Sequence, residues 1–359
     1  MHLSGKRILY GALNWGLGHA SRSVPVIRVL QEHGAEVILA AEGRARKLWE
    51  LEFKNAVFSD IPEYTIRFPE HAYLSWSLFS QLPQLLRQIQ HEQDHVEFAV
   101  RQMGIHYVIS DNRFGFYSKQ VPSVYITHQL QVKSAFGSIL PSCWHRAVMN
   151  KFDAVWVPDL PGEDNLSGEL GHDSRVKNVK YIGPQTRLKQ VTANELIDTL
   201  TICSGPEPMR SQLEQYVVNE LRNCPGKHVM VLGKSELSRE RQQVGNIAIY
   251  NYAHDQLLSQ LISNAKVIIS RTGYSTLCDV AQFGKSFIGI PTPGQTEQEY
   301  LGRYLKTKGI TIMDGSSESL RQAVQFPEKN IPLQLSNDES LLDTALRILP
   351  VLLQQKRPT

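Results

Sequence analysis

Residues 266–302 carry the sequence KVIISRTGYSTLCDVAQFGKSFIGIPTPGQTEQEYLG. The runs 266–270 and 286–290 are rich in apolar and β-branched residues, which is typical of buried strands. Each run leads through a glycine or proline turn into a stretch with helical spacing, 275–283 and 297–308. Strands separated by helices of this length pair in parallel through right-handed crossovers. The segment therefore predicts two βα units of a parallel α/β sheet.

The same alternation extends over most of the chain and occurs twice. The sequence predicts strands at 7–13, 36–41, 54–58, 107–110, 123–127, 154–157 and 180–182, and again at 200–203, 228–232, 247–250 and 310–313. Further helices are predicted at 21–33, 210–222 and 255–264. Glycine, proline and polar residues interrupt the pattern at 183–194.

The length agrees with this division, because 359 residues at about 150 residues per domain suggest two domains. We expect an α/β fold of two doubly wound, Rossmann-like domains with parallel sheets, covering residues 1–186 and 187–338. A last amphipathic helix is predicted within 339–359 and could pack back on the first domain.

Composition narrows the possible partners. Lys and Arg number 38 and Asp and Glu 35, and no dense basic run occurs, so we expect no nucleic-acid partner. The four cysteines are scattered, which argues against a disulfide framework or a structural zinc site. No apolar stretch reaches the roughly 18 residues that span a bilayer. We therefore expect a cytoplasmic protein, able to rest on the inner face of the cell membrane.

A glycine-rich loop, GALNWGLGHAS, occupies residues 11–21 between the first predicted strand and helix. Glycines let the backbone approach a ligand closely, and a helix N-terminus attracts anions. The spacing of Gly16, Gly18 and Ser21 resembles a dinucleotide-binding fingerprint, and Glu42 ends the second strand where a ribose-binding acid would lie. An NAD(P)-dependent oxidoreductase is therefore an alternative, although serine replaces the third glycine.

A second polar cluster follows two neighbouring strands of the second half. A glycine turn opens the first helix there, and its N-terminus is a ready site for a diphosphate. The candidate ligand-binding residues of this turn are Arg271, Gly273, Tyr274, Ser275 and Thr276, with Asp279 one turn further on, where a carboxylate can bind ribose hydroxyls. The loop after the next strand adds the polar residues Thr296, Glu297, Gln298 and Glu299, which suit the hydroxyls of a sugar. Open α/β sheets bind ligands at such carboxyl ends of strands.

Together with the Gly16–His19 loop, these segments resemble the GT-B glycosyltransferases of family 28, most specifically over residues 266–302. The type member of that family adds N-acetylglucosamine to a lipid-linked muramyl peptide. The resemblance implies two Rossmann-like domains facing across a cleft, with the acceptor on the first and a nucleotide-sugar donor, a UDP-sugar, on the second. It also implies inverting transfer to a hydroxyl of an acceptor that could be lipid-linked or a glycan, without a cofactor or metal.

The resemblance assigns roles to individual donor-site residues. Asp279 takes the place of a glutamate that grips the donor ribose. Gln298 and Glu299 stand at a pair of glutamines that bind the donor sugar, so Glu299 departs from the pattern and leaves the sugar open.

The phosphate groups of the donor have two expected neighbours by the same resemblance. Ser204 and Gly205 stand at a glycine-rich loop near the donor phosphates. Arg187 follows a Gly-Pro pair as an arginine follows Asn-Pro in the family, where it would neutralise the leaving diphosphate from the hinge. A UDP-sugar epimerase or hydrolase, and a non-catalytic nucleotide-sugar-binding protein, are alternatives on the same frame.

Three residues are candidate bases for deprotonating the acceptor. His19 begins the first predicted helix, where the helix dipole favours a neutral imidazole. Asp111 follows the strand 107–110 at its carboxyl end, and His128 ends the next strand as a weaker choice. The sequence leaves the choice between His19 and Asp111 open. Gly16, Gly18 and His128 are the expected acceptor-binding residues.

Two further patterns lie in the first half. Residues 91–95, HEQDH, match the zinc motif HExxH, but polar neighbours predict a solvated helix face and no metal site. The second pattern is an apolar stripe at helical spacing, which predicts either a core-facing helix or a surface for a lipid-linked acceptor or the membrane. Its members are Leu74, Leu78, Leu82, Leu85, Leu86 and Ile89.

Overall fold

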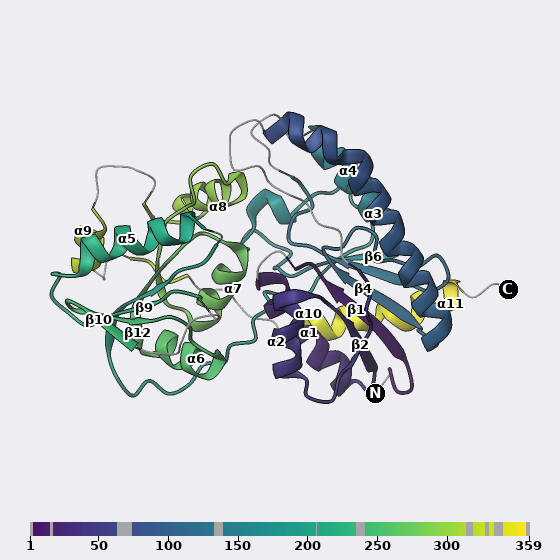
Figure 1. The fold of residues 1–359 in the computed structure, drawn as a ribbon, viewed down its shortest axis with the longest axis horizontal. Coiled ribbons are helices and arrows are strands. Elements are labelled where there is room, and N and C mark those ends of the chain that lie inside the picture. Colours follow the sequence, from purple (N-terminus) through teal and green to yellow (C-terminus); the bar gives the residue numbers. More distant parts are fainter. Residues whose placement is uncertain are drawn as a thin grey trace.

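The computed structural model describes residues 3–14, 17–62, 74–132, 139–205, 207–234, 241–313, 319–326, 330–333 and 340–356, with the side chains of 74–82, 139–140 and 340 excepted. Two sheets with helices packed against them form two lobes that lie side by side (Figure 1). The predicted α/β class with two Rossmann-like domains is confirmed. None of the described helices is long and apolar enough to cross a membrane.

The first sheet has the strand order β3-β2-β1-β4-β5-β6-β7, and every neighbouring pair is parallel. Its strands are β1 (Arg7–Ala12), β2 (Glu36–Ala40), β3 (Val57–Phe58), β4 (Tyr107–Asp111), β5 (Ser123–Ile126), β6 (Ala154–Val157) and β7 (Val179–Tyr181). The helices of this half are α1 (Gly18–Glu32), α2 (Gly43–Glu52), α3 (Leu74–Met103), α4 (Ile139–Met149) and the short η1 (Gly168–Gly171). The central strands are buried on both faces because helices cover both sides of a parallel sheet.

The second sheet has the order β10-β11-β9-β8-β12-β13-β14, parallel except for the antiparallel pair β10 and β11. Its strands are β8 (Ile197–Ile202), β9 (His228–Val231), β10 (Arg241–Val244), β11 (Ile247–Tyr250), β12 (Ala265–Ser270), β13 (Ser286–Gly289) and β14 (Thr311–Ile312). Its helices are α5 (Met209–Leu221), α6 (Asp255–Asn264), α7 (Tyr274–Phe283), α8 (Thr296–Thr307) and α9 (Leu320–Gln325).

The strand orders place a switch point in each sheet. In the first sheet the chain runs outward from β1 in one direction and from β4 in the other. In the second sheet the corresponding pair is β8 and β12. Ligands of open α/β sheets bind in the crevice outside the carboxyl ends of such a pair. The glycine loop after β1, Asp111 at the end of β4 and the turn after β12 are therefore where the fold favours binding sites.

The last two helices return to the first domain. The helix predicted within 339–359 is divided into α10 (Ser340–Leu346) and α11 (Ile348–Lys356). Leu342, Leu346 and Leu349 are buried in the same apolar cluster as β1 and α1. The Lys356 ammonium forms an ion pair with Asp153, which precedes β6. In Figure 1 these yellow helices lie against the purple and blue half of the molecule.

Candidate active site

His19 and Asp111 form one unit at the switch point of the first sheet. His19 lies in the first turn of α1, and Asp111 is the last residue of the neighbouring strand β4. His19 Nδ1 is 2.8 Å from Asp111 Oδ1. His19 Nε2 has no hydrogen-bond partner among the residues that the structure describes, and the side chain keeps 14% exposure. An imidazole whose Nδ1–H is held by a carboxylate has its Nε2 lone pair available as a base.

Arg22 completes this unit, and the sequence analysis did not find it. Arg22 is 3% exposed. Its guanidinium donates two hydrogen bonds to the Asp111 carboxylate, from Nε to Oδ2 at 2.9 Å and from Nη2 to Oδ1. Ser23 Oγ donates a further, longer hydrogen bond to Asp111 Oδ2 at 3.2 Å. Arg22 is three residues after His19 on the same helix, so both side chains lie on one face of α1. The three-residue spacing from His19 was the sequence signal that could have identified Arg22 as its neighbour.

The charges of this cluster act on one another. Burial lowers the pKa of His19, and the neighbouring Arg22 charge lowers it further. Burial alone would raise the pKa of Asp111, but the charges of Arg22 and His19 outweigh it and hold that pKa well below its usual range. The expected protonation states at neutral pH are therefore a neutral His19, an ionised Asp111 and a charged Arg22.

His128 lies just after β5, where the two domains meet. Arg22 Nη1 is 2.9 Å from His128 Nδ1, and His128 Nε2 is 2.9 Å from Oε1 of Glu297, which begins α8 of the second domain. The ring is stacked on Tyr274 of α7, with 4.2 Å between ring centroids. Because both ring nitrogens already have protein partners, His128 is not available as the base, and it joins the two domains instead of facing an acceptor.

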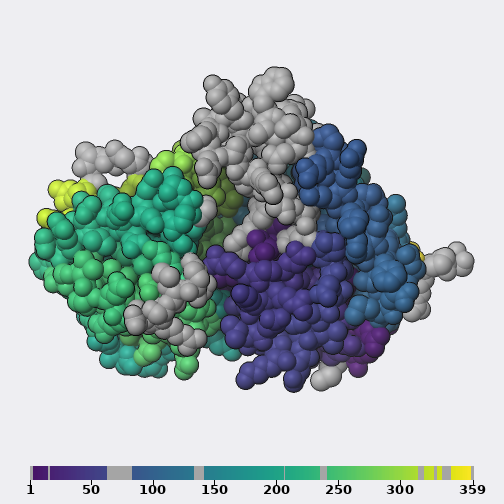
Figure 2. Space-filling view, viewed as in Figure 1, coloured from purple at the N-terminus to yellow at the C-terminus, as the bar shows by residue number. Residues whose placement is uncertain are grey.

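The glycine loop of the first domain contacts the N-terminus of α7. A Cβ atom on Gly18 would lie 2.7 Å from Ser275 Oγ, so only glycine allows this approach. Tyr274 is buried and donates a hydrogen bond to the Pro158 carbonyl at 2.5 Å, which ties α7 to the first domain. The base-bearing turn of α1 and the predicted diphosphate site therefore lie side by side. Figure 2 shows the two halves of the chain in contact along this boundary.

The predicted sugar-binding loop packs onto the same helix end. Gln298 is buried, its Oε1 accepts from the Thr292 amide at 3.0 Å, and its backbone carbonyl accepts from Thr272 Oγ1 at 2.7 Å. Its Nε2 lies close to Gly273, the residue before α7. Glu299 Oε1 accepts from the Gly294 amide at 2.8 Å. The loop thus brings Gln298 beside the predicted diphosphate site.

Asp279 meets the hinge between the domains. Its Oδ1 accepts a hydrogen bond from Thr186 Oγ1 at 2.5 Å. Burial raises the pKa of Asp279 to about 6, and the hydrogen bond from Thr186 opposes this shift only in part. A carboxylate that is costly to ionise while buried gains from hydroxyl donors, which the two ribose hydroxyls would supply.

Two arginines predicted for the donor site, Arg187 near the diphosphate and Arg271 in the turn before α7, both contact protein groups. Arg187 Nε donates to Ser21 Oγ at 2.7 Å, and its Nη1 forms ion pairs with Glu52 and Asp255. Arg271 donates to the carbonyls of Met209, Ile290 and Pro291. In this arrangement Arg187 links α1 to α6 across the domains, and Arg271 holds loops together.

Most of the remaining predicted residues are exposed or partly exposed to solvent. Ser204 is partly exposed and Gly205 exposed after β8, at the switch point of the second sheet. Ser275 and Thr276 are partly exposed in the first turn of α7, and Thr296 is partly exposed at the start of α8. Gly16 lies outside the described residues, as does part of the glycine loop around it.

The HExxH segment needs a correction. The sequence predicted a solvated helix face, but Glu92 is 1% exposed and forms an ion pair with the fully buried Arg113 at 2.6 Å. Its other oxygen accepts from the Gly115 amide at 2.8 Å. The prediction was wrong for Glu92 and the neighbouring Gln93, which are buried, whereas His91 and Asp94 are exposed as expected. Arg113, 21 residues from Glu92, supplies the partner that allows this carboxylate to be buried. The Glu92 carboxylate is thus unavailable as a general base beside His91 and His95.

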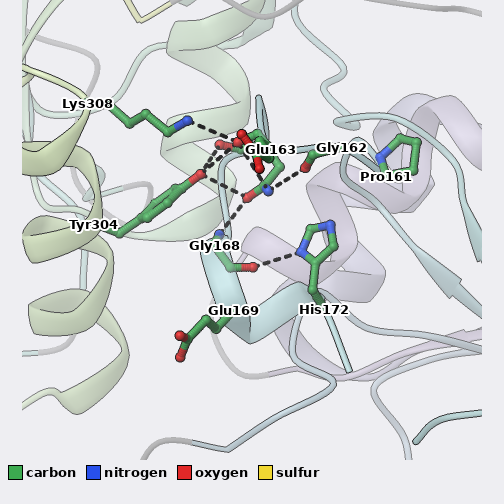
Figure 3. A pocket seen from close by; sticks show the side chains of 9 residues that line it. Pro161, Gly162, Glu163, Gly168, Glu169, His172, Tyr304 and Lys308 are labelled. Atoms are coloured by element: carbon green, nitrogen blue, oxygen red, sulfur yellow. Dashed lines mark hydrogen bonds between the residues drawn. The ribbon is translucent and has the colours of Figure 1, made fainter. Parts of the chain in front are cut away.

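A separate cavity of about 490 Å³ lies between the segment 161–172 and α8. Figure 3 shows Tyr304 of α8 and Lys308, the residue that follows this helix, reaching toward Glu163 across it. Its lining contains none of the residues predicted for the site. His172 Nδ1 bonds to the Gly168 carbonyl at 2.8 Å. This cavity therefore belongs to the contact between the domains and not to the candidate active site.

Comparison with known proteins finds similar glycosyltransferases. Residues 210–331 match the sequence family "Glycosyltransferase family 28 C-terminal domain". A relative from Sulfurihydrogenibium sp. (strain YO3AOP1), UDP-N-acetylglucosamine--N-acetylmuramyl-(pentapeptide) pyrophosphoryl-undecaprenol N-acetylglucosamine transferase, is 26% identical over 159 residues. These residues make up 42% of this chain and 41% of the relative, so the alignment covers less than half of either protein.

Solved structures extend the likeness to the whole chain. The glycosyltransferase SnogD from Streptomyces nogalater has a TM-score of 0.62 at 16% identity, covering 99% of this chain and 96% of that one. MurG from Acinetobacter baumannii has a TM-score of 0.55 at 16% identity, with the same coverage of both chains. The chain therefore has the GT-B fold of these glycosyltransferases, and its second domain belongs to the glycosyltransferase family 28 C-terminal domains.

Proposed function

We propose that this protein is an inverting glycosyltransferase that moves a sugar from a nucleoside diphosphate donor to a hydroxyl of an acceptor. One observation carries the proposal: the His19–Asp111 pair lies beside the N-terminus of α7, where Gly18 meets Ser275. A base and an anion-binding helix end are the two elements that this reaction needs, and they come from different domains. The family match of the second domain supports the same reaction.

The reaction would begin with the acceptor hydroxyl bound to Nε2 of His19. Nε2 takes the hydroxyl proton while the oxygen attacks the anomeric carbon from the face opposite the diphosphate. The bond between that carbon and the phosphate oxygen breaks, and the configuration at the carbon inverts. Asp111 stabilises the imidazolium that forms, since its carboxylate is 2.8 Å from Nδ1. A positioned base of this kind contributes roughly 100- to 10,000-fold.

The leaving diphosphate would be bound at the N-terminus of α7. Backbone N–H groups around Gly273, Ser275 and Thr276 point out of the helix end, and its dipole favours negative charge. Such pre-arranged donors stabilise charge that develops in the transition state. We propose that this suffices without a metal ion, so transfer should continue in excess EDTA. Asp279 would bind the ribose hydroxyls, and Gln298 with Glu299 the sugar.

The identity of the donor and acceptor rests on relatives. The name of the Sulfurihydrogenibium relative specifies UDP-N-acetylglucosamine and an undecaprenol-linked acceptor. We therefore propose a UDP-sugar donor and a lipid-linked acceptor, with the protein resting on the cytoplasmic face of the membrane. A rhamnosyltransferase of the same fold was solved with thymidine diphosphate, so the base of the nucleotide needs a direct test.

The first test measures nucleotide binding by calorimetry with UDP, dTDP, GDP and NADH, on the wild type and on Asp279→Ala. The proposal expects UDP to bind and Asp279→Ala to weaken it. Tight binding of NADH that Asp279→Ala leaves unchanged would instead favour a dinucleotide site in the glycine loop. Binding of none of the nucleotides would overturn the proposal.

The second test measures release of UDP from a panel of UDP-sugars, with and without a lipid-linked acceptor. Acceptor-dependent release that His19→Ala abolishes would support transfer, and NMR of the product would give its anomeric configuration. Release that needs no acceptor would identify a hydrolase, and interconversion of the UDP-sugars an epimerase. Binding without any turnover over the full panel would identify a nucleotide-sugar-binding protein.

A further inference from the structure

The Arg22 guanidinium is the centre of a chain that crosses the domain boundary. Arginine has only N–H donors, so a ring nitrogen that forms a hydrogen bond with its guanidinium must be the acceptor of that bond. Nε and Nη2 bind Asp111, and Nη1 is 2.9 Å from Nδ1 of His128. His128 Nδ1 must therefore carry its lone pair, and the single proton of the neutral ring is on Nε2.

This proton position connects the chain to the donor domain. His128 Nε2 is 2.9 Å from Oε1 of Glu297, so Nε2–H donates to that carboxylate. Tyr274 of the same domain covers the face of the ring at 4.2 Å. Glu297 and Tyr274 come from α8 and α7, whereas His128 and Arg22 belong to the first domain. The proton of His128 is thus held on Nε2 from two sides, by Arg22 of the first domain and by Glu297 of the second.

Arg22 also decides what Nδ1 of His19 can do. Nη2 of Arg22 and Oδ1 of Asp111 are each 2.8 Å from that nitrogen. Nδ1 can either donate its proton to Asp111 or accept one from Arg22, and only the first leaves a lone pair on Nε2 for the acceptor hydroxyl. A guanidinium held toward Asp111 and His128 favours the first arrangement, because its N–H groups then have other acceptors.

We propose that Arg22 is a positioning residue, held through His128 by Glu297, so that His19 has its base form only when the two domains are in contact. The proposal rests on the proposed function for the role of His19. Separation of the domains removes both Glu297 and Tyr274 from His128. The ring can then turn away from Arg22, and Arg22 loses an acceptor. Its freed N–H groups compete for Nδ1 of His19.

The test determines the ring tautomers by long-range 1H–15N NMR on protein labelled with 15N-histidine. Spectra of His19→Gln and His128→Gln assign the two rings. In the wild type saturated with UDP we expect a proton on Nε2 of His128 and on Nδ1 of His19. Glu297→Gln keeps an acceptor oxygen and should preserve both. Glu297→Leu should give His128 ring 15N signals averaged between the two tautomers. It should also shift the ring 15N signals of His19, although Glu297 forms no hydrogen bond with His19.

Tyr304→Phe is the matched control, because the Tyr304 hydroxyl bonds across the domains to the Glu163 carbonyl at 3.2 Å, away from this chain. It should leave both tautomers unchanged. An unchanged His19 in Glu297→Leu, or a proton on Nδ1 of His128 in the wild type, overturns the proposal. These measurements need no transfer reaction, so their outcome is independent of the proposed function. The tautomers can differ from those expected in a protein that transfers sugars, and they can agree in a protein that does not.

A kinetic measurement separates positioning from a structural role. Arg22→Lys keeps the charge but loses the two-pronged hold on Asp111. Misplacement of a catalytic group by about 1 Å costs on the order of 100-fold, so we expect kcat to fall by about this factor while KM for the donor stays within about twofold. A raised KM with unchanged kcat would contradict the proposal.

Discussion

At the residue scale, the site depends on a histidine and an aspartate that the sequence presented as rival bases. In the structure His19 Nδ1 lies 2.8 Å from Asp111 Oδ1, so the aspartate orients the histidine ring. Asp111 is buried, and an unpaired carboxylate there would be costly. Arg22 compensates it and keeps it ionised. These contacts give the two residues different expected roles. His19 would be the base through Nε2, and Asp111 would orient the imidazole ring through Nδ1.

The first prediction separates these roles. His19→Ala should lower kcat for transfer by roughly 100- to 10,000-fold, because it removes the base, with little change in UDP affinity. Asp111→Asn should cause a similar loss, since an amide can hold the ring in the wrong tautomer. The measurement is steady-state UDP release together with calorimetry. Full activity of Asp111→Asn would show that the carboxylate has no part in orienting His19.

The second prediction concerns the stability of the native state and Asp279. Its folded pKa of about 6 lies above its ordinary value of 3.8, so the contribution of this group to stability is present below pH 4 and is lost as the pH rises to about 6. Asp279→Asn stays neutral and should be more stable than the wild type at pH 8, by up to about 3 kcal/mol. Urea unfolding from pH 4 to pH 8 measures the difference, and a difference independent of pH would contradict the prediction.

At the element scale, two segments are positioned by contacts that cross the chain. The glycine loop between β1 and α1 reaches the N-terminus of α7 because Gly18 has no side chain. The long helix α3 is tied to the first sheet by Glu92, which pairs with Arg113 just after β4. The Arg113 guanidinium also donates to the carbonyls of Ala40, Ile61 and Pro62. This buried pair fixes α3 relative to several loops at once.

The third prediction tests the approach of the glycine loop to α7. Gly18→Ala should weaken UDP binding, because the new Cβ lies 2.7 Å from Ser275 Oγ and the two segments must move apart. Removal of that hydroxyl in Gly18→Ala/Ser275→Ala should recover part of the loss. A double-mutant cycle by calorimetry should give a coupling energy above about 0.5 kcal/mol. Additive effects would mean that the loop and helix do not touch in solution. Gly162→Ala, where a Cβ meets nothing within 4 Å, is the control.

The fourth prediction concerns the buried ion pair. Glu92→Ala leaves the Arg113 charge buried without its partner and should lower the free energy of unfolding by about 3–5 kcal/mol. Zinc should not stabilise the wild type, because the described residues contain no group of three or more His, Cys, Asp or Glu side chains that could hold a metal ion. His91→Ala, on the exposed side of the same turn, should change stability by less than about 0.5 kcal/mol. Chemical denaturation gives both values, and equal losses in the two variants would contradict this account.

At the scale of the whole molecule, each domain has its own apolar core, but the chain crosses between them twice. The C-terminal helices α10 and α11 belong to the core of the first domain, although they follow the second in sequence. Contacts such as Tyr274 with Pro158 and Arg187 with Ser21 join the domains near the candidate site. Closure of two domains around a substrate can exclude water from the reaction and assemble the catalytic groups.

The fifth prediction tests this connectivity. Leu346 in α10 and Leu200 in β8 are both fully buried, in the cores of the first and second domains respectively. Each change to alanine should cost about 2–5 kcal/mol. Hydrogen exchange followed by mass spectrometry should show Leu346→Ala weakening protection in β1 and α1, and Leu200→Ala in β9 and β12. Loss of protection in the second domain on Leu346→Ala would contradict the assignment of α10.

Much of the architecture could be predicted from apolar runs such as residues 7–13 and 266–270 and from the helical stretches between such runs. Helix and strand periodicity depends on neighbours within a few positions along the chain. The short elements were harder: the third strand shrinks from 54–58 to Val57–Phe58, and the predicted last helix divides in two. The location of the site at the carboxyl ends of β1, β4 and β12 also followed from the order of strands and turns, since parallel sheets bring these ends together.

The roles of individual side chains needed the folded chain. Asp111 lies 92 residues from His19, and Glu297 lies 169 residues from His128. Such pairs depend on strand order and on how the domains meet, neither of which leaves a periodic signal in the sequence. Glu92 illustrates the same limit, because its carboxylate, which looks solvated in the sequence, is buried against an arginine 21 residues away. Local sequence determines the elements and the edge of the sheet, whereas contacts between distant residues determine which group acts and which group holds it.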